Sequence, residues 1–134
     1  MHPNYWLGLA AYVVPTFPLG YVWHLRTFKA HYDRLEMYRR DVLIPLGIGS
    51  MLIQGLVFAW LYPLVFDTSA DAWIGSAVRC ALVFGVLAWS FTTLPVAAKY
   101  RTASVKGFLV LETAFTAVHF AIVAPSIALA FRAS

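Results

Sequence analysis

Few ionisable residues interrupt the apolar stretches of this sequence, and these are the ones that could carry chemistry. Arg79, Glu112 and His119 each lie well inside an apolar stretch. An ionisable side chain in hydrocarbon is costly and usually faces protein or water, so it marks a candidate functional site. Counting about 1.5 Å of rise per helical residue places Arg79 and His119 roughly 10 Å below one membrane surface. Tyr12 and Gln54, in two other stretches, fall at the same depth.

Glu112 lies closer to the opposite surface, about 12 Å from it, and shares a helix face with His119. Arg79 could reach Glu112 as a buried ion pair, which would relieve the cost of both charges. Five residues are therefore expected to line a polar pocket open to the outer side: Tyr12, Gln54, Arg79, Glu112 and His119. An arginine there would orient an anion through its planar fork, which predicts an anionic or carbonyl-bearing lipid-like ligand.

The same residues also have a purely structural interpretation. Buried polar groups can bond one another across helices and specify only packing. Arg79 can instead extend outward to lipid headgroups. The sequence leaves both interpretations open.

Neither a metal site nor a catalytic motif accompanies these residues. His119 has no second histidine at its depth, so a bis-histidine haem is not expected. The lone Cys80 excludes an internal disulfide, and no Cys/His spacing typical of zinc sites occurs. Glu112 and His119 lie about 10 Å apart along a helix, too far to act on one proton. We therefore expect no cofactor, no metal and no enzymatic activity.

The composition shows which elements must position these side chains. Hydrophobic residues make up 61% of the chain and charged residues 12%, against roughly 25% charged in soluble proteins. Four apolar blocks are each long enough to cross a hydrocarbon core, which takes roughly 20 helical residues. We predict an all-α integral membrane four-helix bundle, a single transmembrane domain over residues 1–134. Its spans are placed at about 5–25, 42–64, 72–97 and 105–131.

Basic residues predict the orientation of these spans. The connector between the first two spans, about residues 26–41, carries five lysines and arginines, and Lys99, Arg101 and Lys106 surround the last turn. The turn between the second and third spans carries only Asp67 and Asp71. By the positive-inside rule both termini lie on the outer, periplasmic side of the cell inner membrane. The net charge of +4 is therefore a topology signal, and no nucleic-acid partner is expected.

The connector has the pattern of an amphipathic helix. Phe28, Tyr32 and Leu35 recur at helical spacing. Two i,i+4 ion pairs are expected on the polar side, Lys29 with Asp33 and Glu36 with Arg40. Such a helix could lie on the lipid surface or prolong the first span, and both arrangements stay open.

Small residues gather on the second span, at Gly47, Gly49, Ser50 and Gly55, and permit close approach of another helix. The leading functional hypothesis is therefore a noncatalytic accessory or structural subunit. It would pack against another membrane protein, or self-associate, among membrane lipids. The alternative is binding or transport of a lipid-like or small hydrophobic anion through the polar layer.

Two stretches resemble small four-span bacterial membrane proteins of the DUF2177 and DUF1761 families. They are LGYVWHLRTFKAHYDRL, from Leu19, and GVLAWSFTTLPVAAKYRTASVKGFLVLETAF, from Gly85. Glu112 matches an acid early in the fourth span of those proteins, whereas Thr92 and Thr93 stand where they carry an acid or asparagine. The resemblance implies a four-span fold in the bacterial inner membrane and no particular activity.

Overall fold

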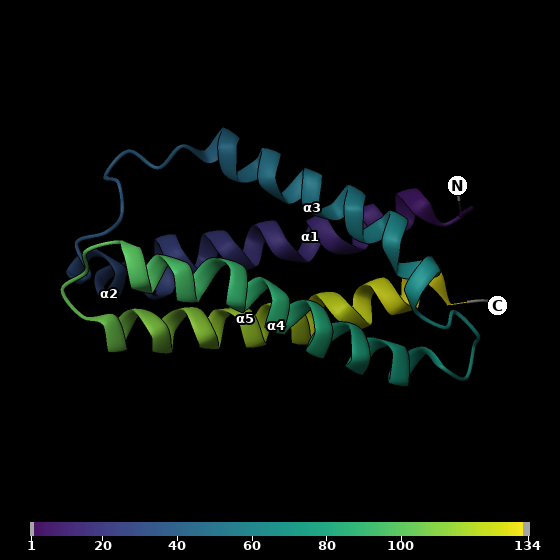
Figure 1. Ribbon diagram of the computed structural model, residues 1–134. Helices are drawn as coiled ribbons and strands as arrows, with labels where there is room; N and C mark the ends of the chain where they lie inside the picture. The colour runs from purple at the N-terminus through teal and green to yellow at the C-terminus, as the bar shows by residue number, and fades with distance from the viewer. Residues whose placement is uncertain (1, 133–134) are drawn as a thin grey trace.

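The computed structural model describes residues 2–132, so the first residue and the last two of the predicted domain lie outside it. The described chain is helical and contains no strand (Figure 1). Its elements are α1 (Tyr5–Val22), a π-helical turn η1 (Trp23–Thr27), α2 (Lys29–Arg34), α3 (Ile44–Val65), α4 (Trp73–Lys99) and α5 (Val105–Phe131). Of these, α3, α4 and α5 are long and apolar enough to cross a membrane. The all-α prediction is confirmed, and these three helices support a membrane protein.

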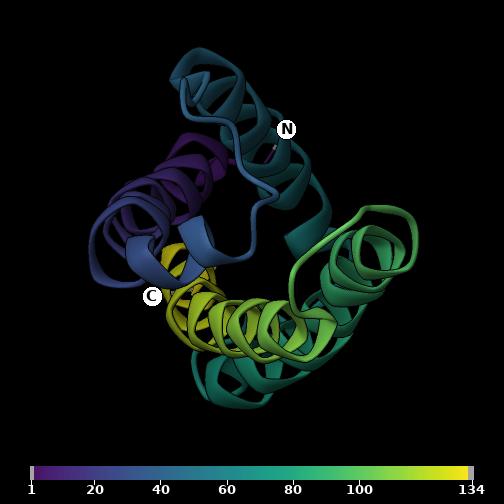
Figure 2. The same ribbon diagram turned by 90° about the vertical axis from the view of Figure 1, so that its left-hand side faces the viewer.

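The four long helices run side by side, but the backbones of one pair of neighbours stay apart. α4 and α5 pack as an antiparallel pair, α5 also packs against α1, and α1 packs against α3. α3 and α4 meet through side chains, with the rings of Phe58 and Phe84 4.7 Å apart, and α3 leans away from the others at its Ile44 end (Figure 1). An end-on view shows the resulting open ring, with α3 separated from α4 (Figure 2).

The two ends of the molecule differ in charge. At one end the rings of His2 and Phe131 lie 5.0 Å apart, and Arg132 Nε donates to the Ala70 carbonyl at 2.9 Å, beside the acidic turn. At the other end Thr102 Oγ1 donates to the Leu35 carbonyl at 3.2 Å. The two basic segments therefore meet at one end, and the acidic turn lies with the chain's first and last described residues at the other.

The connector turns its apolar face toward the protein. Tyr32 and Leu35 are buried, with Phe108 of α5, in a small core of their own. Lys29 and Asp33 form the expected pair on the exposed side, with Nζ 2.6 Å from Oδ2. The connector thus follows α1 through η1 and folds back onto α5, a packing that the sequence did not predict.

The connector helix ends earlier than its pattern predicted. α2 stops at Arg34, because Glu36 adopts a left-handed backbone conformation with φ of 57° and the helix cannot continue through it. The expected pair between Glu36 and Arg40 is therefore absent from the described residues. Arg39 instead pairs with Asp41, with Nη2 2.9 Å from Oδ2.

The main core lies toward the end that carries the acidic turn, where helices approach most closely. Ala59, Val123, Ala124 and Ile127 are fully buried there. A Cβ added at Gly55 would lie 2.7 Å from Leu9 Cδ1 of α1, so this glycine permits close packing within the chain.

The other residues of the predicted small-residue surface on α3 do not pack against a neighbouring helix of the chain. A Cβ at Gly47 or Gly49 would meet nothing within 4 Å, and Ser50 is exposed. The four residues therefore do not form one packing face. Gly55 packs against α1, whereas the others lie where α3 leaves the bundle.

Candidate binding cavity

A cavity of about 730 Å³ occupies the space where α3 leaves the bundle. Its walls come from α1, η1, the connector, α5, residues 44–58 of α3 and residues 84–92 of α4. Most of the lining is apolar, and it includes the aromatic rings of Phe17, Phe58, Phe84 and Phe115. The backbones of α3 and α4 separate toward the Ile44 end of α3, and the cavity lies between these two helices there.

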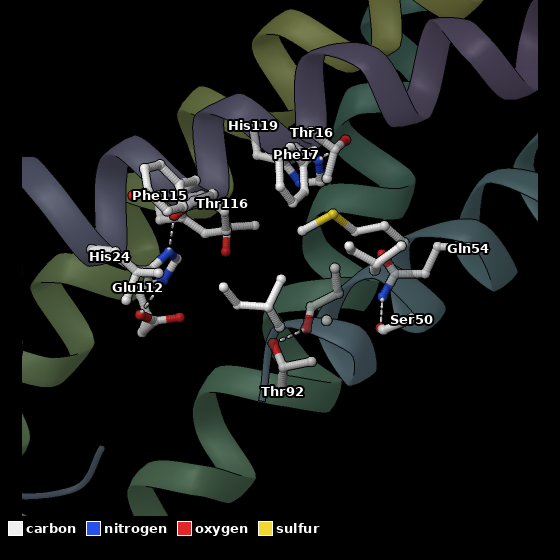
Figure 3. A pocket seen from close by; sticks show the side chains of 18 of the residues that line it. Thr16, Phe17, His24, Ser50, Gln54, Thr92, Glu112, Phe115, Thr116 and His119 are labelled. Atoms are coloured by element: carbon white, nitrogen blue, oxygen red, sulfur yellow. Dashed lines mark hydrogen bonds and ion pairs between the residues drawn. The ribbon is translucent and has the colours of Figure 1, made fainter. Parts of the chain in front are cut away.

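Glu112 of α5 provides the acidic group of this cavity. Its Oε1 accepts hydrogen bonds from the Tyr32 hydroxyl at 2.6 Å and the Tyr38 hydroxyl at 3.4 Å. His24 Nε2 lies 3.4 Å from the same oxygen (Figure 3). The connector and η1 thus surround one carboxylate oxygen with three polar groups.

The His24 ring faces an acceptor on each side. Its Nδ1 lies 3.0 Å from the Gly20 carbonyl oxygen, which only accepts, so Nδ1 carries a hydrogen. His24 thus bridges the Gly20 carbonyl of α1 and the Glu112 carboxylate of α5.

The π-helical turn η1 places His24 at this position. A π turn widens the backbone by one residue and is frequent at functional sites. The turn η1 lies between the end of α1 and the connector helix α2. Its Trp23 Nε1 donates a hydrogen bond to the Tyr32 hydroxyl of α2 at 3.2 Å. η1 and α2 are thus joined at the carboxylate they both contact.

Aromatic rings enclose the acid. Tyr32 and Tyr38 stack with ring centroids 4.8 Å apart, and His24 lies 4.5 Å from Phe115. Burial raises the pKa of Tyr32, and its hydrogen bond to Glu112 raises that pKa further. Tyr32 therefore remains a protonated donor to Glu112 across the physiological pH range.

A second polar group lies deeper in the cavity. His119 Nε2 is 2.9 Å from Thr16 Oγ1 of α1, and the pair is buried. On α3 the Gln54 amide donates to Ser50 Oγ at 3.1 Å (Figure 3). These groups satisfy one another and also border the cavity.

The structure brings together three of the five residues predicted to line a pocket. Gln54, Glu112 and His119 border the cavity. Tyr12 is buried behind it, and its hydroxyl donates to Gln54 Oε1 at 2.6 Å. Tyr12 therefore supports a lining residue without lining the cavity itself.

Arg79 is far from this arrangement, and the expected ion pair with Glu112 is wrong. Arg79 is exposed on α4, and its guanidinium lies beside Gly75, one turn nearer the acidic turn. Glu112 meets the connector instead. The lining of the cavity extends to Tyr38 and Arg39 of the basic connector, at the opposite end of the molecule from the acidic turn.

Sequence reasoning missed His24, Tyr32 and Tyr38 as site residues. Each stands at the edge of an apolar stretch, where aromatic and basic residues are common at a membrane interface. Only the backward fold of the connector distinguishes them from interfacial residues. Within residues 2–132, no group of three His, Cys, Asp or Glu side chains is placed to hold a metal ion.

Comparison of the chain with family models, curated proteins and solved structures finds no match. The geometry of the cavity is therefore the feature that indicates a function.

Proposed function

We propose that the protein is a multi-pass protein of the cell inner membrane that binds a lipid-like amphiphile in the cavity beside α3. In this proposal α1, α3, α4 and α5 are the four spans. Both termini and the acidic turn face outward, and the two basic segments face the cytoplasm. The collection of basic residues at one end of the molecule supports this orientation.

The observation that carries the proposal is the cavity itself. Ligand sites typically enclose about 300–1,000 Å³, with apolar walls and a few placed polar groups. The volume of about 730 Å³ falls in this range, and Glu112, His119 and Gln54 supply the polar groups. An amphiphile with one polar end and an apolar body matches this lining.

Two glycines on α3 provide a matched test. Gly47 lines the cavity and Gly49 does not, although neither has a neighbour within 4 Å. Residues two apart on a helix point about 200° away from each other. Gly47→Leu should therefore fill the cavity, and Gly49→Leu should add the same bulk outside it.

The measurement is native mass spectrometry of the detergent-extracted protein. The wild type and Gly49→Leu are expected to retain a small molecule, and Gly47→Leu to retain several-fold less. Equal retention by both variants, or none by the wild type, would contradict the binding proposal.

The open side of α3 favours a second candidate, an accessory subunit that packs against another membrane protein or a second copy. The open space at Gly49 permits close approach of a helix. In that case Gly49→Leu should release the partner while the chain stays folded. Gly55→Leu is a poor test of assembly, because Gly55 packs against α1 within the same chain.

A further inference from the structure

We infer that the cavity selects amphiphiles that carry a positive charge, with the Glu112 carboxylate as their counter-ion. This inference rests on the proposed binding function and adds the chemical class of the ligand. It replaces the anion that the sequence suggested when Arg79 was expected in the pocket.

The charges around the cavity favour a cation. Glu112 is the only acidic residue within α1, α3, α4 and α5. Arg39, which also lines the cavity, already pairs with Asp41. An anionic ligand near Glu112 would therefore meet a like charge in a poorly solvated site.

The hydrogen bonds of Glu112 leave room for a ligand. Tyr32, Tyr38 and His24 all approach Oε1. Among the described residues, no side chain donates to Oε2, and Glu112 faces the cavity (Figure 3). A carboxylate oxygen without a donor in an apolar cavity is costly, and an ammonium group would relieve that cost.

The aromatic lining favours the same class of ligand. Phe17, Tyr21, Tyr38 and Phe115 border the cavity on the side of α1, the connector and α5. Aromatic faces attract organic cations, more strongly where water is excluded. A ligand with an alkylammonium or similar head and an apolar body would use both the carboxylate and the rings.

Two ions of the same shape test this selectivity in the detergent-solubilised, full-length protein. Tetraphenylphosphonium and tetraphenylborate each carry four phenyl rings and differ in the sign of their charge. We expect the cation to bind at least about tenfold more tightly, as measured by calorimetry. Equal binding, tighter binding of the anion, or binding of neither ion would overturn the charge selectivity.

Variants then locate the source of the selectivity. Glu112→Gln should abolish the preference for the cation while its amide oxygen still accepts from Tyr32. Asp33→Asn removes the same charge from the exposed connector surface, away from the cavity, and should leave the preference intact. The comparison of the two ions in the wild type needs no variant, so misfolding of Glu112→Gln would not remove the test.

A competition distinguishes an amine-headed lipid from a bulky cation. A long-chain alkylamine that displaces tetraphenylphosphonium, when the alcohol of equal length does not, supports an amine-headed amphiphile. Displacement by amine and alcohol alike would overturn the role of charge. Failure of the inference alone would leave the difference in retention between Gly47→Leu and Gly49→Leu unchanged, whereas failure of the proposed function would remove that difference.

Discussion

The two tyrosines on Glu112 should contribute unequally to stability. Tyr32 is 1% exposed, and its hydroxyl lies 2.6 Å from Oε1, whereas the Tyr38 hydroxyl lies 3.4 Å away. Hydrogen bonds to charged groups contribute about 1.5–3 kcal/mol. Tyr32→Phe should lower the free energy of unfolding in mixed micelles by about that amount, and Tyr38→Phe by much less. Equal losses would contradict the geometry.

The site residues that the sequence identified, and those it missed, have a common physical explanation. Glu112 and His119 stand out because charge inside an apolar stretch is rare. Counting residues along a helix gives the depth of Arg79 but not which neighbouring helix its side chain faces. His24 and Tyr32 reach Glu112 only because the connector folds back, a contact between distant parts of the chain that no local pattern encodes.

At the scale of the helices, close approach depends on glycines with particular neighbours. A Cβ at Gly8 would overlap the Phe131 ring, with Cζ 2.6 Å away, and that ring is itself buried against Tyr62. A Cβ at Gly85 would meet Phe120 at an ordinary 3.5 Å. Gly8 and Gly85 both lie inside helices, so the same substitution at each compares a crowded position with an uncrowded one.

Gly8→Ala should destabilise the protein by about 1–3 kcal/mol through overpacking, whereas Gly85→Ala should be neutral or slightly stabilising. Denaturant unfolding in mixed micelles gives both values. A neutral effect of Gly8→Ala would mean that α1 and the end of α5 can separate more easily than their packing indicates.

The helices themselves were largely predictable, and their boundaries lie close to those of the expected spans. Apolar length determines such helices, because every backbone group in hydrocarbon must be paired within the segment. The connector was harder. Its apolar period correctly placed Tyr32 and Leu35 on one buried face, but Glu36 breaks the helix through its backbone conformation, and glutamate is no signal for that break.

At the scale of the whole molecule, the separation of acidic and basic ends predicts accessibility from the two sides of the membrane. Ala70 lies in the acidic turn and Ala103 in the last basic turn, and both are exposed. Cys80, the lone cysteine, is buried, so an introduced cysteine reports its own position. Ala70→Cys should react with a membrane-impermeant maleimide in intact cells, and Ala103→Cys only after the membrane is opened. The reverse pattern would invert the proposed orientation.

The loose position of α3 was not predictable from composition. Its sequence is as apolar as that of α4 or α5, yet Leu46 remains 70% exposed where the helix leaves the bundle. Apolar character drives a helix into the membrane but does not choose between lipid and protein as its neighbour, because both are equally apolar. The cavity exists because this part of α3 does not pack against the other helices, which its apolar sequence alone does not predict.

The separation of α3 from α4 at the Ile44 end also has a consequence for how a ligand would reach the cavity. If these helices cross a membrane as proposed, an amphiphile would enter between them by lateral diffusion within a leaflet and not through water. Its occupancy would then follow its partition coefficient as much as its contacts. An amphiphile enriched about a thousandfold in the bilayer would half-fill a site of ~1 mM intrinsic dissociation constant at ~1 μM in the aqueous phase. Weak contacts at Glu112 would therefore suffice for strong apparent binding, and the amount of lipid present would set the affinity that is observed.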